Sequence, residues 1–323
     1  MGPGLRRDDD EGGHQGVRAN GPLLFRLEAR LGETGVLLAF LLPALVLLVF
    51  AQFYPLVYSA IVSFYDWTLS RSPLPGGFVG FANYEKAIAD RVFVGSITMT
   101  VVFAISSTLL QMSLGLGLAL LTVGEGLALK LSRTLLMLPM VVAPVAVGTI
   151  WRMLLSARVG PVNKLLASLG IDGPNWLGDP TWAVVSLILI DAWEWLPFVT
   201  IIYIAALTSL PGEVLKAASV DGASRWQIFV SVVWPMLLPV TVLVAMFRLI
   251  DSLLTLDLVF TTTFGGPGFA THTLSFWIYQ QGLRYFNISY AAATSWLLLI
   301  ACMIVAGVFL LWRRRLMRWQ GGR

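Results

Sequence analysis

A polar, helix-forming stretch lies between two long apolar segments and reads Ser209-Leu-Pro-Gly-Glu-Val-Leu-Lys-Ala-Ala-Ser-Val-Asp-Gly-Ala-Ser-Arg-Trp-Gln-Ile-Phe-Val-Ser-Val-Val-Trp-Pro235. Pro211-Gly212 ends the first segment, and Glu213 then stands near the start of a new helix, where the helix dipole favours a carboxylate. Asp221-Gly222 offers a turn, because glycine takes the left-handed conformation that ends a helix. The stretch therefore predicts two short helices joined by a glycine bend, a rigid projection that suits docking to a partner.

The side chains of this stretch indicate which helix faces another surface could contact. Ala217 and Ala218 are small, so another surface can approach the helix backbone closely. After the bend, apolar residues recur at helical spacing on one side of the chain, namely Trp226, Phe229, Val230 and Val233, until Pro235 marks the return to an apolar segment. From these residues alone, a helical hairpin that simply lies on a membrane surface is an equally good interpretation.

The segments around this stretch predict a membrane protein. Of the 323 residues, 57% are hydrophobic and 12% are charged, and the mean hydropathy is +0.78. A soluble chain of this length needs more polar surface. Because a backbone in lipid must satisfy its own hydrogen bonds, long unbroken apolar runs select helices. The predicted fold class is therefore all-α, a polytopic membrane protein with six transmembrane helices at about 35–62, 92–123, 134–156, 181–208, 232–258 and 286–312.

The chain reads as one membrane domain with two short tails. We expect a tail over 1–34, with a candidate interfacial helix at Leu23–Leu31, a transmembrane domain over 35–315 that contains the polar loop 209–235, and a basic tail over 316–323. Residues 1–22 are polar and glycine-rich and lack the pattern of a cleavable signal peptide. The first span is therefore expected to act as a signal anchor.

Lysine and arginine residues predict the orientation. Most of them fall in the two tails and in the alternate loops that include 209–231, which the positive-inside rule assigns to the cytoplasm. Both termini are then cytoplasmic. The loops 63–91, 157–180 and 259–285 face outward and are rich in Gly, Pro and Trp. They could form a docking surface, although ordinary turns have the same composition.

The stretch as a whole resembles the cytoplasmic coupling motif of binding-protein-dependent ABC importer permeases, which is Glu-Ala-Ala, three residues, Gly, nine residues, Ile, any residue, Leu, Pro. Ala217, Ala218, Gly222 and Pro235 match at the motif's spacing, and Val232 is a close substitute for the Ile. The resemblance implies that this loop transmits motion from an ATPase subunit.

Two positions depart from that motif. Lys216 stands where the motif has Glu, and Trp234 stands where it has Leu. Glu213, one turn earlier, is the candidate for any ion pair that the motif's Glu makes with the ATPase. The residues that the resemblance assigns to coupling are Glu213, Lys216, Ala217, Ala218, Asp221, Gly222, Ala223 and Pro235.

Further matches point to the carbohydrate subgroup of these permeases. The matching residues are Tyr54-Pro55 with Ser63-Phe64, Phe78–Tyr84, Leu138-Pro139 with Trp151-Arg152, Asp221-Gly222-Ala223 and Thr263–Pro267. The chain is most similar to the first of the two permeases in importers for maltose, trehalose or glycerol-3-phosphate. This resemblance implies a second homologous permease, two ATPase subunits that bind ATP and Mg, an extracytoplasmic solute-binding protein and a sugar-type substrate.

Charged residues inside two predicted spans are candidates for the translocation path. Asp191 and Glu194 lie one turn apart, interleaved with Trp193 and Trp195. Charges at this depth are costly unless they face protein or water, so they are expected to point inward. Aromatic rings beside hydrogen-bonding groups suit a sugar. The alternative interpretation is structural pairing with a partner permease.

Arg248 and Asp251 in the fifth span are spaced to pair on one helix face, which reduces the cost of burying both. They form either a static intrahelical pair or part of a gate, and Asp257 is turned away from that pair. Pro43, Pro139, Pro144, Pro197 and Pro239 are expected to kink or interrupt helices at membrane depth, either to line a cavity or with no special role.

Other function classes are less consistent with the sequence. No Gly-x-x-x-x-Gly-Lys-Ser/Thr phosphate loop occurs, so ATP hydrolysis is expected in a separate subunit and no cofactor in this chain. Cys302 is expected to be a buried packing residue, and His14 and His272 have no neighbours at metal-ligand spacing. The net charge of +4 reflects topology rather than nucleic-acid binding. An ion-coupled secondary carrier using Asp191, Glu194 and Asp251 is the main alternative, and a scaffold or intramembrane enzyme is the third.

Overall fold

The computed structural model describes residues 23–124 and 126–321 and divides into two units, Met1–Ile61 and Val62–Arg323. The first unit is helical where it is described: α1 is Leu23–Leu48, a π-helical turn η1 covers Val49–Phe53, and α2 is Tyr54–Val62. The side chains of residues 40–58 are exposed and, apart from Gln52, mostly apolar, as lipid contact requires. The candidate interfacial helix at Leu23–Leu31 is helical and forms the start of the longer α1, and its place at an interface stays a prediction. Most of the predicted tail, residues 1–22, lies outside the described residues.

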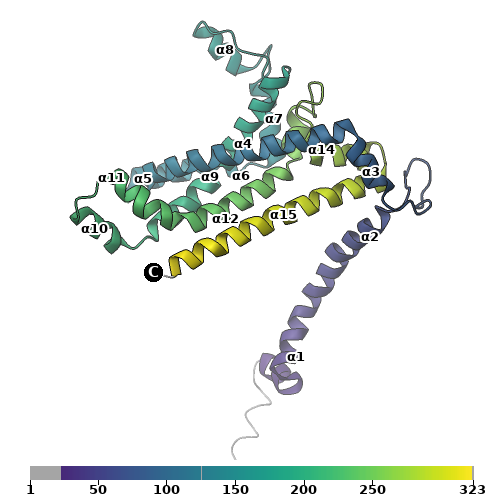
Figure 1. Ribbon diagram of the computed structural model, residues 1–323, viewed down its shortest axis with the longest axis horizontal. Helices are drawn as coiled ribbons and strands as arrows, with labels where there is room; N and C mark the ends of the chain where they lie inside the picture. Colours follow the sequence, from purple (N-terminus) through teal and green to yellow (C-terminus); the bar gives the residue numbers. More distant parts are fainter. Residues whose placement is uncertain (1–22, 125, 322–323) are drawn as a thin grey trace, which may run out of the picture. The chain divides into compact units, whose positions relative to one another are not determined.

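Four long helices form the body of the second unit: α4 (Arg91–Thr122), α9 (Pro180–Thr208), α12 (Trp234–Leu253) and α15 (Ile288–Gly321). They lie side by side in Figure 1. Asp90 begins α4 by accepting hydrogen bonds from the backbone of Val92 and Phe93, and Asp179 begins α9 in the same way, with Pro180 at the first helical position. Between these helices, buried apolar residues such as Phe103, Leu187 and Val199 form the core.

The third predicted span is broken into three pieces. The pieces are α5 (Leu127–Leu136), α6 (Leu138–Val141) and α7 (Pro144–Leu154), and the two arms bend by 95° at the break. The span predicted at about 134–156 begins earlier, at Leu127, and is interrupted near Pro139 and Pro144, as predicted. Pro139 and Pro144 each occupy the first turn of a new helix, where a missing N–H costs nothing. Pro43, Pro197 and Pro239, by contrast, lie inside helices that continue past them.

In the described chain, five helices are long and apolar enough to cross a membrane, and the number is six if the bent pair counts as one span. This agrees with the predicted six-span, all-α fold. The fifth span begins earlier and ends earlier than predicted, at Arg225–Leu253 rather than 232–258, because α12 ends at Leu253 and a separate helix, α13 (Asp257–Thr262), follows.

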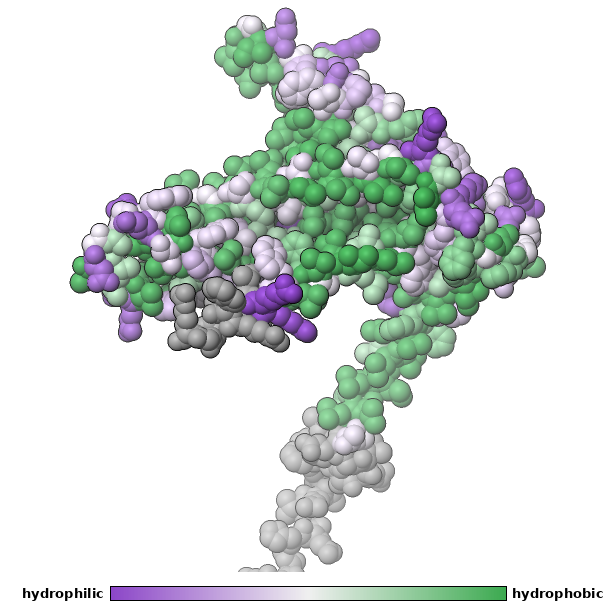
Figure 2. Space-filling view, viewed as in Figure 1, coloured by the Kyte–Doolittle hydropathy of each residue, from purple (hydrophilic) through white to green (hydrophobic). Residues whose placement is uncertain are grey.

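Polar side chains gather at the ends of the second unit. One end carries α10 (Gly212–Val220), α11 (Arg225–Ile228) and the π-helical η2 (Phe229–Val233). The other end carries α3 (Ala82–Ala89), α14 (Leu274–Tyr279) and the π-helical η3 (Gln280–Arg284), while α8 (Pro161–Ser168) lies on the connection from α7 to α9. Figure 2 shows hydrophilic residues over these ends with an apolar band between them, the pattern of a membrane-embedded body.

Candidate functional site

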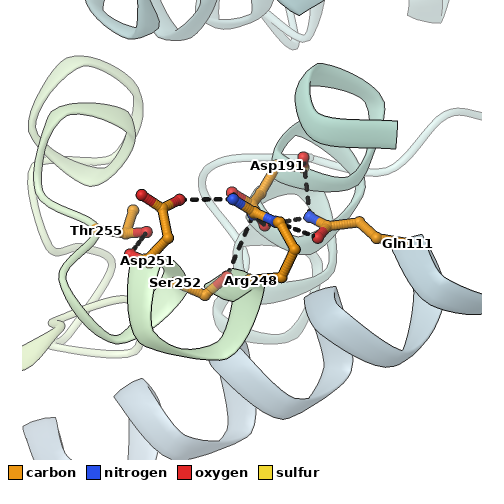
Figure 3. Close-up of polar contacts among 6 residues, drawn as sticks. All are labelled: Gln111, Asp191, Arg248, Asp251, Ser252 and Thr255. Carbon is orange, nitrogen blue, oxygen red and sulfur yellow. Dashed lines mark hydrogen bonds and ion pairs between the residues drawn. The ribbon is translucent and has the colours of Figure 1, made fainter. Parts of the chain in front are cut away.

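A buried arginine joins three helices in the middle of the body. Arg248 of α12 places Nη2 3.3 Å from Oδ2 of Asp191 on α9 and Nη1 2.6 Å from Oδ2 of Asp251, one turn further along α12 (Figure 3). Arg248 and Asp191 are both buried, so each charge is removed from solvent and compensated by the other. The predicted pair of Arg248 with Asp251 is present. The sequence did not indicate the longer-range pair with Asp191.

An amide on α4 completes the cluster. Gln111 accepts a hydrogen bond from Nε of Arg248 at 2.6 Å, and its Nε2 donates to Oδ2 and to the backbone oxygen of Asp191 at 2.7 and 3.1 Å. Arg248 also donates to Oγ of Ser252, and Trp195 lies 4.5 Å from the guanidinium, ring centroid to Cζ. Sequence reasoning missed Gln111. The available signal was an amide in the centre of an otherwise apolar span.

Asp251 is the part of the cluster that is accessible. Its side chain is 51% exposed, while that of Arg248 is 2% exposed. A half-exposed carboxylate at this depth faces water or another protein rather than lipid, because lipid cannot solvate it. Asp257, predicted to be turned away from the pair, lies on the separate helix α13 and forms no ion pair with a described residue.

Glu194 and Trp193 lie next to the cluster on α9. Glu194 is 4% exposed, and no described residue donates a hydrogen bond to its carboxylate. Its charge interacts with those of Asp191, Arg248 and Asp251, so it belongs to the same region of the protein. Trp193 is 41% exposed and packs edge-on against Trp151 of α7. All five residues predicted for the path (Asp191, Trp193, Glu194, Arg248 and Asp251) therefore lie on α9 and α12, two helices that pack against each other.

The stretch 209–235 forms the predicted helical hairpin, with one difference. Its first helix is α10, with Glu213 in the first turn, and Gly222 has φ +80°, as the predicted bend requires. The second helix was predicted to be short, and this is wrong: α11 continues through η2 into α12, so the hairpin is built directly onto a membrane span. Ser224 and Gln227 cap its start reciprocally. Pro235 lies in the first turn of α12.

The hairpin carries a shallow hollow that is open to solvent. The hollow measures about 370 Å³ and is lined by Ala218, Asp221, Gly222, Ala223, Gln227, Ile228, Ser231 and Val232. Lys216 and Glu213 are exposed beside it, and neither forms an ion pair with a described residue. The apolar residues after the bend do not share one environment, since Val233 is buried and Trp226 is 72% exposed. Small residues, a hollow and an exposed indole make a surface suited to a protein partner.

The remaining candidates lie away from these two sites. Cys302 is buried, as predicted. His272 is buried in the connection between α13 and α14, where its ring nitrogens contact Oγ of Ser96 at 3.0 Å and Oε1 of Gln280 at 2.9 Å. Because Oε1 of Gln280 accepts, Nε2 of His272 carries the proton. The hydroxyl of Ser96 also donates to the backbone oxygen of Val92 at 2.8 Å. Among the described residues, no three His, Cys, Asp or Glu side chains are grouped as metal ligands.

Comparison with known proteins identifies the family. Residues 111–319 match the family described as binding-protein-dependent transport system inner membrane component. The chain is 31% identical over 283 residues to the sulfoquinovosyl glycerol transport system permease protein of Agrobacterium fabrum, covering 87% of this chain and 91% of that protein. It is 32% identical over 211 residues to the trehalose/maltose transport system permease protein of Thermococcus litoralis, covering 65% of this chain and 70% of that protein.

A solved structure supports the fold. A chain of a bacterial alginate ABC transporter, in complex with a periplasmic protein bound to an alginate pentasaccharide, superposes with a TM-score of 0.77 at 22% identity, covering 90% of this chain and 98% of that one. The family match covers more than half of this chain and includes α9, the hairpin and α12. The chain therefore belongs to the family of inner-membrane permease components of binding-protein-dependent ABC transport systems.

Proposed function

We propose that this chain is a pathway-forming subunit of an ATP-driven importer for a sugar or sugar derivative, in which a separate ATPase supplies the energy. The observation that carries the proposal is a hairpin with a glycine bend built directly onto α12, the helix that holds Arg248 and Asp251. Movement of the hairpin is transmitted along α12 to the buried cluster. Family membership and the names of the sugar permeases that the chain resembles support the substrate class.

The proposed complex contains a second homologous permease, two ATPase subunits and an extracytoplasmic solute-binding protein. ATP and Mg bind to the ATPase subunits. The hairpin docks through Glu213, Lys216, Ala217, Ala218, Asp221, Gly222 and Ala223, with Pro235 at the root of α12. A side chain of the ATPase enters the hollow beside Gly222. The hairpin end and both termini face the cytoplasm of a bacterial cell, and the opposite end faces the binding protein.

The proposed pathway runs along the faces of α9 and α12 that carry Trp193, Glu194 and Asp251. Arg248 and Asp191 hold these two helices together behind that face. Closure of the ATPase pair moves the hairpin, and the rigid helices carry that motion to the cluster, so that the pathway opens alternately to each side.

The Gly222 bend provides a direct test of coupling. A β-branched residue does not adopt φ +80°, whereas asparagine tolerates this conformation. Gly222→Val is expected to abolish ATP hydrolysis stimulated by the loaded binding protein, while Gly222→Asn retains most of it. Assembly with the ATPase is measured in parallel by co-purification. Normal coupling in Gly222→Val would contradict the role of the hairpin. Solute uptake by the purified chain alone, driven by an ion gradient, would instead indicate a secondary carrier.

A further inference from the structure

We infer that the pathway is built for neutral polyhydroxylated solutes and rejects sugars that carry a sulfonate, phosphate or carboxylate group. This inference rests on the proposed function, because it assumes that the faces of α9 and α12 line the route of the solute. It concerns the charge of the solute, on which the relatives of this chain differ: a sulfoquinovosyl glycerol carries a sulfonate, whereas trehalose and maltose are neutral.

The charges on the two helices are predominantly negative. The charged residues of α9 and α12 are three carboxylates and one guanidinium, namely Asp191, Glu194, Asp251 and Arg248. All four lie within the membrane-spanning helices, where the low dielectric makes each charge act over a longer distance than in water. Arg248 pairs with the buried Asp191, which leaves the half-exposed carboxylate of Asp251 as the accessible charge. An anion that approaches this region is repelled.

The single cation is not available to bind an anion. Arg248 donates to Gln111, Asp191, Asp251 and Ser252, and the indole of Trp195 covers its face. Recognition of a sulfonate, phosphate or carboxylate normally uses a guanidinium fork that presents two N–H groups to the ligand. Here the side chain is 2% exposed and its donors point into the protein, so no fork remains for the solute.

The groups that remain for the solute are acceptors and rings. Asp251 is half-exposed, so its carboxylate is within reach of a solute. A sugar hydroxyl is a suitable donor to this acceptor. The exposed ring of Trp193 provides a flat surface for the C–H face of a pyranose. A neutral sugar satisfies both kinds of group, while a sulfonate or phosphate offers only further acceptors.

The test uses the complete importer, with both permeases, the ATPases and its binding protein, in vesicles loaded with ATP. The vesicles receive two equimolar pools of solutes, and mass spectrometry identifies what accumulates. One pool contains neutral mono-, di- and trisaccharides that include trehalose and lactose. The other contains sulfoquinovosyl glycerol, trehalose 6-phosphate and alginate disaccharide. We expect a neutral sugar to accumulate at least tenfold more than any anionic solute.

Charge variants then locate the selectivity. Asp251→Asn is expected to raise the ratio of anionic to neutral uptake on the order of tenfold, which is the effect of removing one like charge about 10 Å away at an effective dielectric near 20. Glu194→Gln is expected to raise this ratio in the same direction by a smaller factor. Asp172→Asn is the matched control, because it makes the same change at an exposed residue between α8 and α9 and leaves the ratio unchanged.

The outcomes separate this inference from the proposed function. If the complex hydrolyses ATP but accumulates anionic solutes, or no neutral sugar, the inference is overturned while the importer assignment stands. An unchanged uptake ratio in both charge variants overturns it as well. If no complex with an ATPase forms, the proposed function fails and the inference fails with it.

Discussion

Arg248 and Asp191 stand 57 positions apart in the chain and meet between α12 and α9, with 3.3 Å between Nη2 and Oδ2. Both residues are buried, and Gln111 of α4 bonds to each of them. Three helices are thus joined by one guanidinium at membrane depth. This arrangement lets a static ion pair and an accessible carboxylate, Asp251, share the same arginine.

Removing the buried carboxylate should destabilise the protein strongly. Asp191→Leu leaves Arg248 buried without its interhelical partner, so we expect a loss of about 3–5 kcal/mol in the free energy of unfolding. The double variant with Arg248→Met should cost less than the sum of the two single variants, because it leaves no unpaired guanidinium in the interior and Asp251, which loses its partner, is half-exposed. Thermal unfolding of the purified complex measures both effects. Strict additivity of the two substitutions would contradict the coupling.

Two glycines on α4 should respond in opposite ways to alanine. A Cβ at Gly115 would lie 2.7 Å from Cγ1 of Val199, whereas a Cβ at Gly117 would meet no atom within 4 Å. Gly115→Ala should therefore lower stability by about 1–3 kcal/mol through overpacking of α4 against α9. Gly117→Ala should be neutral or raise stability by about 0.5–1 kcal/mol, because alanine is the better helix former. Equal melting temperatures for the two variants would contradict the close packing of α4 against α9 at Gly115.

The start of α4 should depend on the side chain of Asp90. Its Oδ1 accepts from the backbone nitrogens of Val92 and Phe93 at 2.8 and 3.3 Å, and its Oδ2 accepts from the hydroxyl of Tyr290 at 3.4 Å. Asp90→Ala should cost about 0.5–2 kcal/mol. Asp90→Ser restores the cap without the contact to Tyr290 and should recover most of the loss. Hydrogen exchange at the first turn of α4 is the local measurement, and unchanged protection in Asp90→Ala would argue against the cap.

Acid should destabilise the protein in part through His272, which lies between α13 and α14, outside the spans. Burial lowers the pKa of His272 below its ordinary value of 6.5, although the hydrogen bond to Gln280 opposes the shift. The fold therefore favours the neutral ring. Its contribution to stability is complete above pH 6.5 and is lost progressively as the pH falls towards the lowered pKa.

The corresponding measurement is the melting temperature at pH values of about 7.5 and 5.5, on either side of the ordinary histidine pKa. The wild-type protein should lose more stability over this interval than His272→Gln, whose side chain does not titrate. A His14→Gln variant serves as the matched control and should follow the wild type. Identical pH dependence of the wild type and His272→Gln would exclude His272 as a source of acid lability.

Local signals predicted the hairpin and most of the spans well. Gly222 takes the positive φ that a turn after a helix requires, and Glu213 lies in the first turn of α10. Proline was a less dependable signal. Pro139 lies in the first turn of α6 and Pro144 begins α7 after the 95° bend, while Pro197 and Pro239 lie inside continuous helices. The difference depends on how neighbouring helices accommodate the lost hydrogen bond, which no local pattern records.

The sequence by itself determined that the chain is a helical membrane protein, where its polar hairpin lies and which residues pair within a helix, because hydropathy, glycine and helical spacing act over a few residues. Only the tertiary structure decided that Gln111, Asp191 and Arg248 share one buried cluster, that Asp251 is its accessible carboxylate, and that the hairpin continues into α12. These relationships join segments far apart in the chain. They depend on the rotation and packing of whole helices, which the periodicity of any one helix leaves open.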